Sequence, residues 1–198
     1  MVDPNQHDQF LLRQKFAPVI NRYQFSLSED EPPFCFVEQK RFTFKEDIRF
    51  YTDEAKTTEL MRIKARQRFD PRATYDVTGA DGSKIGEIKK AFGTSLLRST
   101  YEIDSPAGAV TAQEKNLGVA LFRRLVGWVP YIGDFADWLP IPYHFDFVRD
   151  GGVIGTHSRR IGKFRDIYDI DMTGDPERKL DRRLVLAIAV GMDALQAR

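Results

Sequence analysis

A short acidic run before the C-terminus, DIDMTGD, has residue types and spacing that suit a metal ion. Asp169, Asp171 and Thr173 fall at the first, third and fifth positions of a calcium loop. The pattern then ends, because Leu180 stands at the twelfth position, where such a loop has a bidentate glutamate. Calcium is therefore a weak expectation. The competing interpretation is two aspartates on the outer face of a strand.

Two basic runs have the chemistry to hold lipid phosphates. Alternate residues of a strand share one side, so MRIKARQR directs four cations the same way, namely Arg62, Lys64, Arg66 and Arg68. HSRRIGKFR supplies a second patch with Arg159, Arg160 and Lys163. Each Lys or Arg near an anionic surface contributes about 1 kcal/mol to binding. The alternative is a solvated strand face whose charges are neutralised by acidic neighbours.

The segment 116–142 combines an amphipathic pattern with aromatic residues. A helical projection places Arg123 and Arg124 on its polar side, and both tryptophans of the chain, Trp128 and Trp138, lie in this segment. Such a helix suits the membrane interface, lying on the bilayer without crossing it. An amphipathic helix is by default a core-facing one, so packing on one end of the fold is the alternative.

Enzyme chemistry has little support in the sequence. The three histidines are isolated, and neither a nucleophile elbow nor a phosphate loop is present. Cys35 is the single cysteine, which leaves no thiolate zinc site and favours a reducing compartment. We therefore expect a protein that is not an enzyme and has no cofactor unless calcium binds. Because 30 Lys and Arg stand against 29 Asp and Glu, a nucleic-acid partner is less favoured.

The elements that position these residues follow a repeat. Pairs of short strands, several joined by Gly-bearing turns such as Asp81-Gly82, recur along the chain and give twelve strands. Equivalent strand positions are Tyr23, Ile48, Tyr75, Tyr101, Phe145 and Tyr168. A meander of this length tends to close, because closure removes unpaired edges. The fold class is therefore mainly β, a closed twelve-stranded antiparallel barrel whose wide lumen must be filled.

The terminal segment 176–196 is predicted to form a helix that fills the lumen of the barrel. Asp175 is predicted to cap this helix, with Pro176 at its first position. Its uncharged stretch from Leu184 to Met192 is shorter than the roughly 20 residues that span a bilayer. A short helix that is apolar all round belongs in a core. The whole chain, 1–198, is thus expected to form one domain, with residues 1–9 flexible and 116–142 inserted between strands.

The hairpins, LPIPYHFDF and the terminal DRRLVLAIAVGMDAL resemble the LURP-one-related and scramblase-like proteins, over roughly Phe10 to Leu195. The resemblance implies the tubby C-terminal fold, a twelve-stranded barrel around a buried C-terminal helix. Relatives divide between membrane-lipid binding, phospholipid scrambling and nuclear roles, and scramblases are thought to bind calcium just before their last helix. The chain lacks the proline-rich N-terminus and cysteine cluster of animal scramblases.

These observations lead to a non-enzymatic module that binds phospholipid at a membrane surface. Two alternatives stay open: a calcium-dependent phospholipid scramblase, and a soluble protein- or nucleic-acid-binding scaffold. The expected partner is an anionic phospholipid or membrane surface, contacted peripherally. The first ten residues lack the basic-then-apolar order of a secretory signal, so a cytoplasmic location, at the inner face of the membrane, is expected.

Overall fold

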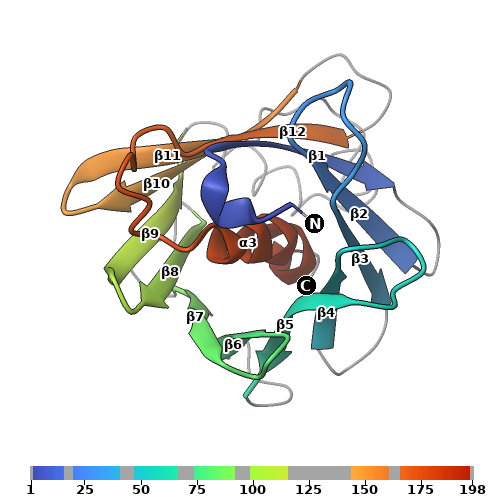
Figure 1. The fold of residues 1–198 in the computed structure, drawn as a ribbon. Coiled ribbons are helices and arrows are strands. Elements are labelled where there is room, and N and C mark those ends of the chain that lie inside the picture. The colour runs from blue at the N-terminus through green and yellow to red at the C-terminus, as the bar shows by residue number, and fades with distance from the viewer. Residues whose placement is uncertain are drawn as a thin grey trace, which may run out of the picture.

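Twelve short strands form the wall of the molecule (Figure 1). Their buried apolar side chains form the core inside it. The computed structural model describes residues 2–15, 20–40, 47–66, 74–91, 99–115, 144–160 and 166–196. The strands are β1 (Gln9–Lys15), β2 (Ile20–Ser26), β3 (Cys35–Lys40), β4 (Asp47–Tyr51), β5 (Glu59–Ala65), β6 (Thr74–Gly79), β7 (Lys84–Lys90), β8 (Thr100–Ser105), β9 (Gly108–Glu114), β10 (His144–Arg149), β11 (Gly152–Arg159) and β12 (Asp166–Asp171).

Each strand pairs antiparallel with its sequence neighbours, and β1 pairs with β12 to close the barrel. The predicted twelve-stranded closed barrel is confirmed. The equivalent aromatic and aliphatic positions all point into the core, and they are Tyr23, Ile48, Tyr75, Tyr101, Phe145 and Tyr168. Side-chain alternation, which places every second residue on the same face, therefore determined the inner surface as the repeat indicated.

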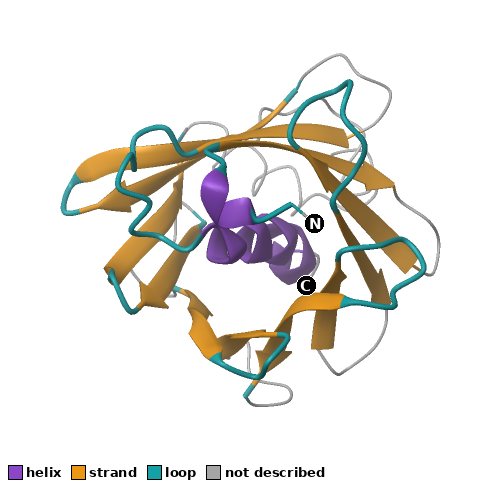
Figure 2. Cartoon of the chain, viewed as in Figure 1, coloured by secondary structure: helices purple, strands orange, loops and turns teal. Residues whose placement is uncertain are grey.

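The helix α3 (Arg182–Gln196) lies inside the ring of strands (Figure 2). Every residue from Leu184 to Met192 is buried, so the uncharged stretch is a core helix as predicted. In the described part of the chain, no helix has the length and apolar character needed to cross a bilayer.

The helix begins at Arg182, later than the predicted start at residue 176, and Asp175 is not its N-cap. Asp181 takes that place, because its carboxylate accepts a hydrogen bond from the Arg183 backbone N–H at 2.9 Å. Asn5, which belongs to the short 3-10 turn η1 (Pro4–Gln6), accepts from the Arg182 backbone N–H at 2.8 Å. The first helical N–H groups thus find side-chain acceptors, one of them from the N-terminal segment.

Candidate functional site

The basic row on β5 faces outward, and its two described arginines are already engaged. Arg62 holds the carboxylate of Asp47 on β4 in a two-pronged contact. Arg66 binds the Asp76 carboxylate at 2.8 and 2.7 Å and also contacts Glu87. The alternative interpretation of this row, neutralisation by acidic neighbours, is confirmed for both arginines.

The pKa values of Asp47 and Asp76 are both lowered by their arginine partners. The hydrogen bond from Arg62 lowers the pKa of Asp47, and the one from Arg66 lowers the pKa of Asp76. Both carboxylates are therefore charged at neutral pH and compete with any anionic ligand for the guanidinium groups. Lys64 lies between these pairs, is exposed, and forms no ion pair with any residue in the described ranges.

The second basic patch follows the same pattern. Arg160 binds both carboxylate oxygens of Asp169 at 2.7 Å and also pairs with Glu29 from the β2–β3 connection. Its neighbour Arg159 is half-buried at the end of β11. This geometry ties a predicted lipid-binding residue, Arg160, to a predicted metal ligand, Asp169.

The first predicted calcium ligand, Asp169, is engaged in the ion pair with Arg160. Asp171 accepts hydrogen bonds from the Thr173 backbone N–H at 2.8 Å and the Thr173 hydroxyl at 2.7 Å, which forms a local turn. Within the described residues, His, Cys, Asp and Glu form no cluster of three or more that could hold a metal ion. Asp169 thus forms an ion pair with Arg160, and Asp171 stabilises a turn through Thr173.

Several predicted site residues lie outside the described part of the chain. They are Arg68, the segment 116–142 with Arg123, Arg124, Trp128 and Trp138, and Lys163. The interfacial-helix prediction for 116–142 stays a prediction.

Four exposed lysines are set apart from this network of pairs, and sequence reasoning missed three of them. Lys15 ends β1, Lys64 and Lys89 lie near the ends of β5 and β7, and Lys115 follows β9. None of the four forms an ion pair within the described ranges. The signal that could have found them is a lysine at or beside the C-terminal end of several odd-numbered strands.

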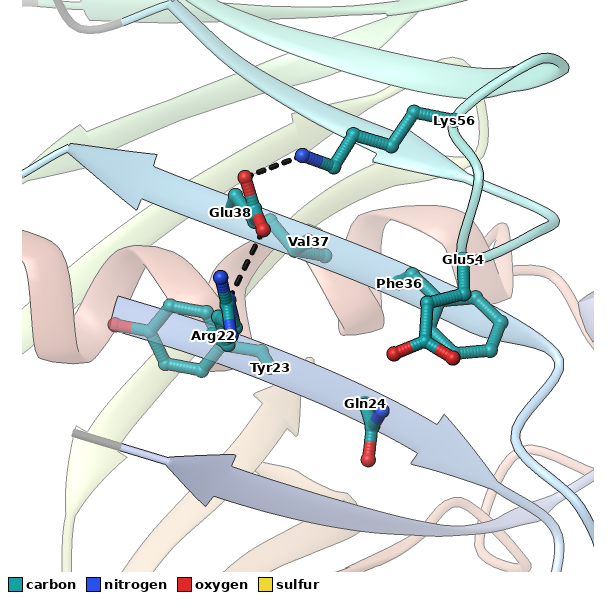
Figure 3. A pocket seen from close by; sticks show the side chains of 8 residues that line it. All are labelled: Arg22, Tyr23, Gln24, Phe36, Val37, Glu38, Glu54 and Lys56. Atoms are coloured by element: carbon teal, nitrogen blue, oxygen red, sulfur yellow. Dashed lines mark hydrogen bonds and ion pairs between the residues drawn. The ribbon is translucent and has the colours of Figure 1, made fainter. Parts of the chain in front are cut away.

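A groove of about 240 Å³ lies on the outer face of β2 and β3, beneath the β4–β5 connection (Figure 3). Phe36 and Glu54 line one part of it. In the other part, the Glu38 carboxylate lies between two cations, Lys56 and Arg22, the latter at 3.0 Å. Lys56 and then Arg22 lower the pKa of Glu38. The cations of the groove are therefore also neutralised.

The deepest polar cluster closes the end of the barrel where α3 begins. The Arg182 side chain is fully buried and donates to Asp175 Oδ2 and Asp8 Oδ1, each at 2.8 Å. Burial would raise the pKa of Asp175, but hydrogen bonds from Arg182, the Leu180 backbone N–H and Arg149 outweigh it, and the pKa is lowered. Every carboxylate here is satisfied by arginine, which indicates a structural role.

One known protein family matches most of the chain. Residues 35–193 match the model of the family described as LURP-one-related. The chain belongs to the LURP-one-related family. A search of curated proteins gives no match. The resemblance seen in the hairpins and the terminal helix is thereby confirmed at the level of the family.

Proposed function

We propose that this LURP-one-related protein is a non-enzymatic module that binds phospholipid at a membrane surface. The observation that carries the proposal is the contrast between its cations. The described basic residues of the predicted rows are largely held in ion pairs, whereas Lys15, Lys64, Lys89 and Lys115 are exposed and form no ion pair in the described ranges. Unpaired surface lysines are the groups that anionic headgroups attract.

The filled lumen supports a ligand on the outer surface. α3 occupies the barrel with a continuous run of buried residues from Leu184 to Met192. A barrel of this size encloses a small apolar ligand only where side chains leave room. A carrier role inside the barrel is therefore disfavoured, and binding through exposed groups follows.

The calcium-dependent scramblase gains no support from the described residues. Its predicted metal ligands Asp169 and Asp171 are engaged by Arg160 and Thr173. A soluble protein- or nucleic-acid-binding scaffold uses the same exposed lysines, so the test must separate it from lipid binding.

Co-sedimentation with vesicles tests the proposal. The full chain is mixed with vesicles of phosphatidylcholine alone, or of phosphatidylcholine with about a third phosphatidylserine, in the presence and absence of calcium. We expect sedimentation with the anionic vesicles, weakened by added salt because exposed charges are screened. A folded protein that stays in the supernatant under all these conditions contradicts the proposal and leaves the scaffold function.

A further inference from the structure

The four exposed lysines lie at one end of the barrel. β1, β5, β7 and β9 are odd-numbered strands of an antiparallel meander, so they run in the same direction and finish at the same end. Lys15, Lys64, Lys89 and Lys115 are each at or within a residue of those strand ends. We call these four residues the lysine rim.

The opposite end of the barrel carries the opposite charge. Its described connections and the N-terminal segment hold a set of acidic residues, namely Asp3, Asp8, Glu29, Asp30, Glu31, Asp53, Glu54, Asp81, Asp150, Asp175, Glu177 and Asp181. The basic residues of the same segments are Lys56, Arg178 and Lys179, and four arginines of adjoining elements pair with some of these acids, namely Arg149, Arg160, Arg182 and Arg183. Among the described residues, acids therefore outnumber bases at this end, which the +1 charge of the whole chain does not reveal.

Acidic side chains beside the lysine rim are mostly neutralised from within the barrel wall. Asp47 is held by Arg62, and Asp76 and Glu87 are held by Arg66. Glu102, exposed and opposite Lys89 in the β7–β8 register, lies outside these pairs. Arg62, Arg66 and Lys84 together thus offset these three carboxylates, and the four rim lysines remain exposed.

We propose that the protein docks end-on to anionic membranes, with the lysine rim toward the lipid headgroups and the acidic end away from them. This inference rests on the proposed phospholipid-binding function and names both the contacting surface and the lipid class. Four cations near one end of the barrel are all attracted to an anionic surface when that end faces it. The acidic end is repelled by the same surface, so both ends favour one orientation.

The expected effect is large enough to measure. A lysine near an anionic bilayer changes affinity by roughly fivefold, and the effect extends over about a Debye length. Replacing all four rim lysines therefore lowers the partition coefficient by well over tenfold.

The test compares two sets of lysine-to-glutamine variants of the full chain. The rim variant carries Lys15→Gln, Lys64→Gln, Lys89→Gln and Lys115→Gln. The control carries Lys56→Gln and Lys179→Gln, which remove lysines held in ion pairs at the acidic end. Partition onto phosphatidylcholine vesicles with about a third phosphatidylserine is measured for wild type and both variants. Circular dichroism and thermal melting verify that each variant is folded.

We expect the folded rim variant to lose more than tenfold in partition and the control to stay within about twofold of wild type. If wild type and the rim variant bind equally, the end-on inference is overturned while phospholipid binding stands. If wild type binds no vesicle, the proposed function itself fails. If wild type ignores vesicles but binds duplex DNA through the rim lysines, the surface is a nucleic-acid site and the membrane inference is overturned.

Discussion

The guanidinium Nη1 of Arg182 lies 2.8 Å from Oδ2 of Asp175, and the two side chains expose only 0% and 3% of their surface. The pair joins the first residue of α3 to the connection that follows β12. Arg182 also donates to Asp8, just before β1, and Arg149 at the end of β10 donates to Asp175 at 2.9 Å. One ion-pair cluster thus fastens the central helix to both ends of the chain and to the barrel wall.

Replacing Asp175 by alanine is expected to lower the free energy of unfolding by about 3–5 kcal/mol. The reason is that the substitution leaves the buried Arg182 charge without its main partner, and an uncompensated buried charge is costly. Urea unfolding followed by tryptophan fluorescence or circular dichroism gives the value.

Glu177→Ala is the matched control, because Glu177 pairs with Lys179 at the surface, where both side chains are more than half exposed. Surface pairs contribute at most about 1 kcal/mol. Equal losses for the two variants would show that the cluster does not anchor the helix.

Stability should depend on pH through His157. Burial, with a further contribution from His144, lowers the pKa of His157 to about 4, against an opposing effect of Asp169. The unfolded chain, whose histidine has its ordinary pKa of 6.5, therefore takes up the proton first as the pH falls. The stabilisation is complete above pH 6.5, declines between 6.5 and 4, and amounts to about 3 kcal/mol over that window.

The measurement is the difference in unfolding free energy between wild type and His157→Gln at pH 7.5 and at pH 4.5. The variant should lose less stability than wild type on acidification, because its side chain does not titrate. A His157→Gln slope identical to that of wild type would contradict the burial argument.

Calcium is expected to leave the protein unchanged. Asp169 is held by Arg160, and Asp171 accepts from Thr173 and from Gln9 at 3.3 Å, so binding would have to break these contacts. Thermal melting with millimolar calcium should match melting with a chelator to within about 1 °C, far less than the shift that a ligand at many times its Kd produces. A calcium-dependent rise that Asp171→Asn abolishes would restore the metal site.

The strands and the buried helix could be predicted because they rest on local signals. Inward positions such as Tyr23 and Tyr168 recur at fixed places in the hairpins, and the uncharged stretch of α3 marks a core helix by itself. The start of α3 was misplaced because Asp175 has the sequence context of a cap. Its carboxylate is instead drawn to Arg182 and Arg149, and Arg149 is far away in sequence.

Which charged residues form ion pairs could not be predicted from the sequence, because the partners are also distant along the chain. The Arg62 and Arg66 row is evident in MRIKARQR, but its partners Asp47 and Asp76 are brought opposite by strand register. Lys15 and Lys115 are equally inconspicuous until β1 and β9 are known to end on the same side. The excess of acids that the described residues show at one end is a property of the folded barrel and does not appear in composition.

The fit of α3 against the barrel wall can be tested at Gly86 on β7. A Cβ atom at this position would lie 2.6 Å from the Asp104 carbonyl oxygen and 2.9 Å from a methyl carbon of Leu184 in α3. Because the carbonyl belongs to the neighbouring strand and cannot swing aside, Gly86→Ala should lower the free energy of unfolding by about 1–3 kcal/mol. Gly152→Ala is the matched control, since the nearest atom to its Cβ is the Arg149 carbonyl oxygen at 3.6 Å, and we expect a change within about 0.5 kcal/mol. The midpoints of urea unfolding of the two variants test this expectation. If the Gly86→Ala protein is as stable as the Gly152→Ala protein, β7 and α3 have room to separate. The barrel would then be packed less tightly around α3 than these distances indicate.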